Sequence, residues 1–176
     1  TKSFYNSKIQ IDILLLSLSK LKNTTIIFTC ANADNDNLII NKKIKSFVKK
    51  NSNSYFYYSL GQKKYYTILK IADVIIGNSS SGILEAPSFK TPTINIGNRQ
   101  DGRVMAKSVI NVGYNSNLLK KAIEKVYSKN FKKILKKSKN PYGNGGATKK
   151  IFDILLKKKF TFTKKFKDIN FKWKFI

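Results

Sequence analysis

The chain has 176 residues, of which 41% are hydrophobic and 12% aromatic, and its formal net charge is +26. This length and composition fit about one globular domain with a buried core, and they argue against a disordered polypeptide. The charge is compatible with nucleic acid or an anionic membrane surface, but all except two of the 35 basic residues are lysines spread along the chain. We therefore expect no nucleic-acid partner.

The residue types that the sequence lacks exclude several kinds of functional site. The sequence holds no histidine and a single cysteine, Cys30, so it lacks an internal disulfide, a zinc-type ligand set and the commonest general base. We expect neither a metal nor a cofactor. No apolar run approaches the roughly 18 residues of a transmembrane helix and no signal peptide is visible, so we expect a cytoplasmic location. The start at Thr1, without a methionine, predicts a fragment or a trimmed product.

Short apolar runs alternate with amphipathic segments along the chain. We predict strands at 24–29, 54–58, 73–77, 93–96 and 109–112. We predict helices at 9–22, 37–50, 61–72, 82–89, 117–127 and 147–156, with a further turn or two at 131–137. This alternation predicts βαβ units and hence an α/β fold, a Rossmann-like three-layer structure with a parallel sheet covered on both faces. Ligands of such sheets bind beyond the carboxyl ends of the strands.

The segment from Gly77 to Gly82 follows the clearest predicted strand and contains three consecutive serines. Hydroxyls and backbone N–H groups at the start of a helix form a site for anions, so Ser79 and Ser80 can donate to phosphate oxygens. Ser81 is a further candidate of the same kind. The alternative is that the serines only cap the following helix.

Both arginines, Arg99 and Arg103, lie in one glycine-bounded loop after the predicted strand 93–96. The arginine fork recognises phosphate or carboxylate in a way that lysine cannot, which favours a ligand contact by Arg99. The alternative is compositional scatter. Glu85, in the predicted helix after the serines, can accept two hydrogen bonds from the hydroxyls of a ribose, or it can simply complement the helix dipole.

A third polar loop follows the predicted strand 24–29. Its Asn32 or Asp34 can bond to a base, sugar or phosphate group, although an Asx turn is the simpler role. Because all three loops follow strands of one parallel sheet, we expect them at the same end of that sheet.

These segments together resemble the hydrolysing UDP-N-acetylglucosamine 2-epimerases. The resemblance is carried by residues 32–34, 76–85, 91–103 and the loop Asn140–Gly145, and it runs from about residue 8 to 156 in order. It implies the C-terminal, UDP-binding half of a two-domain, glycosyltransferase-B-like fold over residues 1–156. The N-terminal half of that fold, and the first strand of this half, are expected to be absent.

The resemblance also implies roles for individual residues. The implied UDP contacts are Asn32, Ser79, Ser80, Glu85 and Arg99, with Asp34, Ser81 and Arg103 as secondary candidates. The serines and Arg99 would hold phosphates, and Glu85 the ribose hydroxyls. The family reaction eliminates UDP from the sugar nucleotide and adds water to the glycal, which releases the free 2-epimer. Its catalytic residues are expected upstream of residue 1, so we expect the chain alone to be inactive and the full-length enzyme to be a homo-oligomer.

Two features depart from the family pattern. Cys30 and Ala31 stand where an aromatic residue and a proline usually precede the asparagine. The lysine–aromatic segment 157–176 has no family counterpart. It suits a membrane surface or an acidic partner, or it packs as a strand or helix on the missing half, or it is disordered. Of these, we expect no membrane contact. The alternative functions are a glycosyltransferase of the same fold and a basic, non-enzymatic binding module. The 2-acetamido sugar is left open between N-acetylglucosamine and its bacterial diamino relatives.

Overall fold

The computed structural model describes residues 7–31 and 36–158. Asn32, Asp34 and most of the basic aromatic segment lie outside the described residues. The chain divides into two compact units, Thr1–Gly143 and Asn144–Ile176. The described strands all belong to the first unit, and the described part of the second unit contains one helix.

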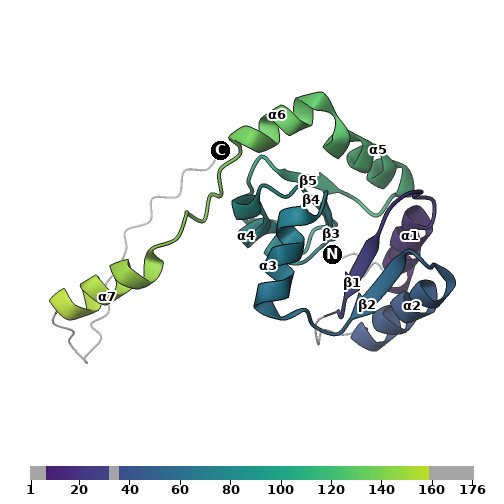
Figure 1. The fold of residues 1–176 in the computed structure, drawn as a ribbon, viewed down its shortest axis with the longest axis horizontal. Coiled ribbons are helices and arrows are strands. Elements are labelled where there is room, and N and C mark those ends of the chain that lie inside the picture. The colour runs from purple at the N-terminus through teal and green to yellow at the C-terminus, as the bar shows by residue number, and fades with distance from the viewer. Residues whose placement is uncertain (1–6, 32–35, 159–176) are drawn as a thin grey trace, which may run out of the picture. The chain divides into compact units, whose positions relative to one another are not determined.

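The elements follow the predicted order (Figure 1). The strands are β1 (Ile26–Thr29), β2 (Ser54–Tyr57), β3 (Ile75–Gly77), β4 (Thr93–Ile96) and β5 (Val109–Val112). The helices are α1 (Ser7–Leu18), α2 (Asn37–Lys50), α3 (Gly61–Ile71), α4 (Ser81–Leu84), the 3₁₀ helix η1 (Ala86–Phe89), α5 (Ser116–Tyr127), α6 (Lys129–Lys137) and α7 (Ala147–Lys157). The predicted turn at 131–137 is thus part of a complete helix.

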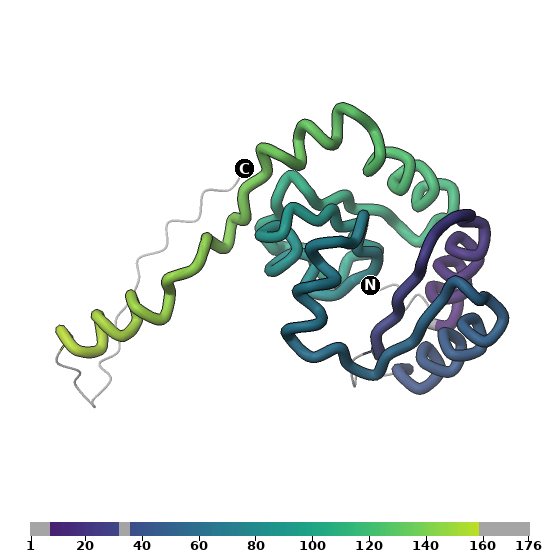
Figure 2. Tube along the Cα trace, viewed as in Figure 1, coloured from purple at the N-terminus to yellow at the C-terminus, as the bar shows by residue number. Residues whose placement is uncertain are grey.

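Every strand pair is parallel, as predicted, but the strands form two sheets instead of one. β1 pairs with β2, with Ile26 opposite Ser54, and the second sheet has the order β3–β4–β5. Figure 2 shows the same division along the chain, with the purple and blue segments grouped apart from the teal ones. Among the described residues, β1 and β3 are not hydrogen-bonded to each other, so neither sheet continues into the other.

Two apolar clusters make the core of the larger unit. One is formed by Ile94, Ile96, Leu119, Ala122, Val126 and Phe131, and the other by Ile11, Leu15, Leu18, Phe28 and Ile44. Leu14 of α1 and Ile76 of β3 pack against both clusters. All four residues of β4 are buried, which explains its nearly continuous β-branched sequence, typical of a strand covered on both faces.

The predicted helix 82–89 is wrong in one respect, because it is broken after Leu84. Pro87 has no N–H to donate and its ring crowds the preceding turn, so an α-helix cannot continue through it. The chain instead forms the short α4 and then η1, with Pro87 near the start of η1. The serine segment therefore precedes a single helical turn and not a long helix.

In the second unit, α7 begins at Ala147 as predicted. None of its residues is buried, and its apolar side chains Ile151, Phe152, Ile154, Leu155 and Leu156 are more than half exposed. Within the described residues, no helix has both the length and the apolar character needed to cross a membrane.

Candidate functional site

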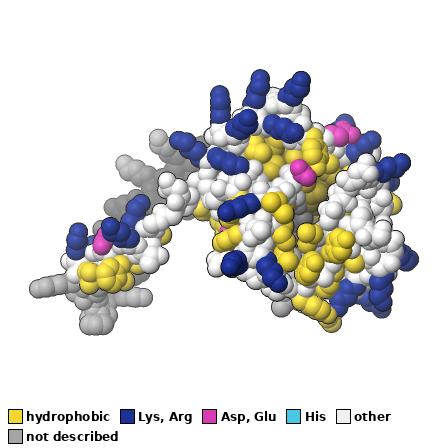
Figure 3. Space-filling view, in the orientation of Figure 1, with side chains coloured by type: hydrophobic (Ala, Val, Ile, Leu, Met, Phe, Trp, Pro, Cys, Tyr) yellow, Lys and Arg dark blue, Asp and Glu magenta, His cyan; other side chains and the backbone are white. Residues whose placement is uncertain are grey.

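A cavity of about 1420 Å³ lies in the larger unit and collects several of the predicted site residues. Its lining includes Ser79, Ser81, Glu85 and Arg99. Ser80 and Arg103 are not part of this lining. Figure 3 shows hydrophobic side chains gathered over the middle of this unit, with lysine and arginine side chains distributed around them. The serine segment, the residue that follows α4 and the loop after β4 thus meet at one cavity.

The serine segment is partly used by its own fold. The Ser79 hydroxyl accepts a hydrogen bond from the Ser81 N–H at 3.3 Å, and Ser80, the residue before α4, makes no capping bond with its side chain. The N–H groups of Gly82 and Ile83 donate to the carbonyl oxygens of Ser79 and Ser80. An anion at this segment would therefore depend on serine hydroxyls and Arg99, since the first N–H groups of α4 are already engaged.

Glu85 is held by a chain of hydrogen bonds that starts on α3. The Ser81 hydroxyl donates to Glu85 Oε2 at 2.9 Å, and Tyr65 of α3 is hydrogen-bonded to the same serine oxygen. Because the serine proton goes to Glu85, the Tyr65 hydroxyl is the donor in the first bond. Burial raises the pKa of Tyr65, the Ser81 bond lowers it, and the negative charge of Glu85 raises it again. The hydroxyl therefore keeps its proton at neutral pH.

The arginine loop is fastened to the serine segment by Gln100. This side chain is 3% exposed, and its Nε2 donates to the backbone oxygen of Asn78 at 2.7 Å. Its Oε1 is buried and has no hydrogen-bond partner among the described residues. Gln100 sets the distance between the loop that carries Arg99 and the loop that carries Ser79.

Two glycines of these loops have identifiable steric roles. A Cβ at Gly82 would lie 2.5 Å from the Thr93 methyl carbon, so Gly82 allows α4 to approach β4. Close approach of a ligand is therefore not needed to explain this glycine. Gly97 has φ +76°, and a Cβ there would lie 2.1 Å from the Tyr114 hydroxyl.

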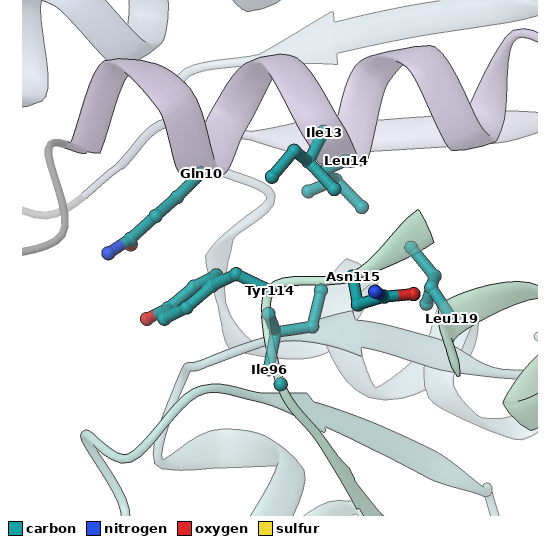
Figure 4. Close-up of a pocket in the computed structure, with 8 residues that line it drawn as sticks. Gln10, Ile13, Leu14, Ile96, Tyr114, Asn115 and Leu119 are labelled. Carbon is teal, nitrogen blue, oxygen red and sulfur yellow. The ribbon is translucent and has the colours of Figure 1, made fainter. Parts of the chain in front are cut away.

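Tyr114 also borders a much smaller hollow of about 10 Å³, roughly the space of one water molecule. In Figure 4, Gln10, Ile13 and Leu14 project from α1 toward Tyr114 and Ile96. Burial raises the pKa of Tyr114. This hollow is too small for a nucleotide, so the large cavity is the candidate site.

The late polar loop is also tied to the serine segment. Asn140 Nδ2 donates to the Leu84 backbone oxygen at 2.8 Å and to the Ser88 hydroxyl at 2.7 Å. This loop, which contributes to the family resemblance, is thus anchored to Leu84 and Ser88, one on each side of Glu85 in the sequence.

Comparison with known proteins gives the family. A family model described as UDP-N-acetylglucosamine 2-epimerase matches residues 5–156. The chain belongs to this epimerase family. It is 46% identical over 133 residues to a GDP/UDP-N,N'-diacetylbacillosamine 2-epimerase (hydrolyzing) of Campylobacter jejuni, covering 75% of this chain and 34% of that protein. It is 42% identical over 134 residues to the polysialic acid biosynthesis protein P7 of Escherichia coli, with 76% and 34% covered.

Solved structures of epimerases share the fold. The UDP-GlcNAc 2-epimerase of Neisseria meningitidis, bound to UDP-GlcNAc, aligns with a TM-score of 0.63 and 21% identity over 87% of this chain and 41% of that one. The predicted fold class is confirmed. This member of the epimerase family spans about a third of the length of the curated relatives it matches.

Sequence reasoning missed two polar residues of the site. Tyr65 falls within the predicted helix 61–72 and Gln100 lies between the two arginines, and neither is among the predicted site residues. The signal for Gln100 was its position inside the arginine loop. Tyr65 had no local signal, because its partner Ser81 lies 16 residues away in sequence.

Proposed function

We propose that the cavity binds the UDP portion of a nucleotide sugar, and that the chain is the UDP-binding part of a hydrolysing 2-epimerase. The observation that carries the proposal is the meeting of Ser79, Glu85 and Arg99 at one cavity from separate segments. A hydroxyl and a guanidinium suit a diphosphate, and a carboxylate suits a pair of ribose hydroxyls. These are the three chemical features that a nucleoside diphosphate presents.

Each residue has a defined task in this proposal. Arg99 and Ser79 hold the phosphates and stabilise the negative charge that grows as UDP departs. Glu85 accepts from the ribose; its Oε2 bond with Ser81 fixes the carboxylate, whose remaining lone pairs stay available. Ser80 and Asn32 remain contacts predicted from the sequence, with Asp34, Ser81 and Arg103 as secondary candidates.

The proposed overall reaction converts UDP-sugar and water into the free 2-epimer sugar and UDP. It breaks the bond between the sugar and the diphosphate and the C2–H bond, and water then adds across the resulting double bond. This chain has no histidine. We assign the proton transfers to residues of a longer polypeptide, so the chain by itself is expected to bind but not to turn over. A 2-acetamido sugar is the proposed substrate class, in line with the names of the relatives.

Isothermal titration of UDP into the chain tests the proposed site. We expect saturable binding by UDP and weaker binding by UMP, because UMP lacks the second phosphate for Arg99. Absence of UDP binding by a chain whose circular dichroism shows an intact fold would overturn the assignment. A cytoplasmic location and homo-oligomerisation of the full-length enzyme stay predictions.

Product analysis on a longer polypeptide separates the epimerase from the two alternatives. The epimerase gives free 2-epimer sugar and UDP. A glycosyltransferase of the same fold gives a glycosylated acceptor instead. A basic binding module would be retained on nucleic acid in a salt-dependent way, whether or not UDP is present.

A further inference from the structure

The helix α6 presents all of its lysines on one face. Its sequence is KNFKKILKK, with lysine at the first, fourth, fifth, eighth and ninth positions. Residues three and four apart lie on the same side of an α-helix, so this spacing places the lysines in one stripe about 12 Å long. The stripe consists of Lys129, Lys132, Lys133, Lys136 and Lys137, all of them exposed, and we call it the lysine face of α6.

The other side of α6 fixes the helix on the larger unit. Phe131 is 3% exposed and belongs to the apolar cluster that includes residues of β4. At the start of the helix, the Ser128 hydroxyl accepts from the Phe131 N–H at 3.2 Å, and just beyond its end Lys90 donates to the backbone oxygen of Ser138. The lysine face is therefore held in place before a partner arrives, which lowers the entropy lost on binding.

No acidic side chain of the same region offsets this charge. The sequence has no Asp or Glu between Glu124 and Asp153. Neither of the ion pairs Lys43–Asp12 and Lys120–Glu124 of the described residues includes a lysine of α6. Figure 3 shows lysine and arginine side chains projecting together from the part of the larger unit where Figure 1 places α6.

This arrangement of charge is unfavourable for the helix itself. Like charges three and four residues apart destabilise an α-helix, and Lys129 stands at the positive end of the helix dipole. A row of negative charges beside the lysine face would remove both effects. The surface is therefore better suited to a bound anion than to water alone.

The residue types of α6 discriminate between anionic partners. Phe131 is buried and Ile134 and Leu135 are partly buried, so α6 has no exposed apolar side chain to insert into a membrane. It also contains neither arginine, whose fork suits phosphate, nor an exposed aromatic residue to stack on a base. A straight row of ammonium groups suits carboxylates that repeat at the same helical spacing, as in charge pairing between two helices.

The chain does not supply such a row of carboxylates. Its 9 acidic residues are scattered along the sequence, and the most closely spaced are Asp34 and Asp36. A second copy is equally poor in acidic residues and carries the same net charge of +26. The complementary surface therefore belongs to a different protein.

We propose that the lysine face of α6 is a docking site for an acidic α-helix of another protein, with carboxylates at positions i, i+3, i+4 and i+7. The lysines then face carboxylates along the whole contact. The complementary charges accelerate encounter and fix the register of the two helices. The proposal uses α6 alone and does not rest on the proposed function.

Fluorescence anisotropy with two labelled peptides tests the match in charge pattern. Both peptides are alanine-rich helices of about 20 residues with equal numbers of glutamates. The striped peptide has its glutamates at i, i+3, i+4, i+7 and i+8, and the dispersed peptide has them spread around the helix. At about 0.15 M salt we expect the chain to bind the striped peptide at least about fivefold more tightly. Equal affinity for the two peptides would overturn the proposal.

Two charge-reversal variants separate α6 from the general charge of the chain. Lys132→Glu with Lys133→Glu changes the middle of the lysine face, and Lys49→Glu with Lys50→Glu makes the same change in net charge at two exposed lysines of α2. We expect affinity for the striped peptide to fall by about tenfold or more in the α6 variant and by less than about threefold in the α2 variant. Equal losses would assign the binding to net charge and contradict the proposal. If circular dichroism shows that either variant is unfolded, the same comparison is made with glutamine at these four positions.

Vesicles containing phosphatidylserine and a single-stranded DNA of about 20 nucleotides test the other two anionic partners. At equal anionic charge, we expect both to bind the chain more weakly than the striped peptide does. Tighter binding by either one, lost in the α6 variant and kept in the α2 variant, would assign the lysine face to a membrane or to nucleic acid and overturn the proposal.

Discussion

The two arginines of the chain differ in their relation to the cavity, although only four positions separate them. Both arginines are exposed, but Arg99 is part of the cavity lining and Arg103 is not. Gln100 fixes the loop between them by its bond to Asn78. At the scale of single residues, the bond between Gln100 and Asn78 holds the loop that carries Arg99 against the segment that carries the serines.

Arg99→Lys is expected to weaken UDP binding by about tenfold or more, because a lysine point charge cannot make the bidentate phosphate contact of arginine. Arg103→Lys is the comparison variant. Because Arg103 does not line the cavity, we expect this variant to change UDP affinity by less than about twofold, and a larger loss would support the contact that the resemblance implies for Arg103. Titration calorimetry on both variants measures the difference. Unchanged UDP affinity in Arg99→Lys would mean that positive charge alone, and not the Arg99 fork, holds the ligand.

Tyr65→Phe removes the donor that holds Ser81 against Glu85 while leaving the ring in place. We expect UDP affinity to fall by roughly three- to tenfold, the value of one hydrogen bond in a partly buried site. Thermal unfolding should change little. Tyr55→Phe, at an exposed tyrosine of β2, controls for the loss of a hydroxyl. Unchanged UDP affinity in Tyr65→Phe would show that Glu85 needs no support from α3.

At the scale of elements, the contact between α4 and β4 positions the serine segment. Gly82 is buried against Thr93, whose hydroxyl donates to the Gly82 carbonyl oxygen at 2.9 Å. The short helix α4 can lie this close to the sheet only because residue 82 has no side chain. The position of Ser81 and Glu85 therefore depends on a helix–strand packing distance.

Gly82→Ala is expected to lower the free energy of unfolding by about 1–3 kcal/mol, since its methyl group would overlap the Thr93 methyl group. Thr93→Ser removes that methyl group and keeps the hydroxyl bond, so the double variant should recover much of the loss. Urea unfolding of both single variants and the double variant gives the coupling. Additive losses in the double variant would contradict the proposed contact.

At the scale of the whole molecule, positive charge opposes the compact state. The formal net charge is +26, and the ion pairs of the described residues include Lys43 with Asp12 and Lys120 with Glu124. The second pair is exposed and 3.9 Å long, so it contributes little. Self-repulsion among the remaining lysines is therefore screened mainly by salt.

Raising sodium chloride from about 0.02 to about 0.2 M should raise the melting temperature by about 3 °C or more, because the screening length falls below about 10 Å. A variant with Lys132→Glu and Lys133→Glu on the exposed surface of α6 carries less positive charge. It should show a smaller dependence on salt in differential scanning calorimetry. A salt effect of the same size in this variant would assign the stabilisation to something other than self-repulsion.

The sequence by itself determined the order of the strands and helices, their parallel arrangement, the family and three polar loops that follow strands. These features are local, because β-branched runs, glycine-bounded turns and amphipathic spacing are each contained in a short window. The break before Pro87 also has a local cause, because proline interrupts an α-helix, although the helix predicted at 82–89 runs through it.

Only the tertiary structure decided which polar groups work together and where the sheet is interrupted. Tyr65 meets Ser81 from 16 residues away, and Gln100 meets Asn78 from 22 residues away. The division into two sheets is also a tertiary feature, since the residues of a strand do not show which other strand it pairs with. Contacts between distant segments depend on how the helices pack on the sheets, and no local pattern encodes that packing.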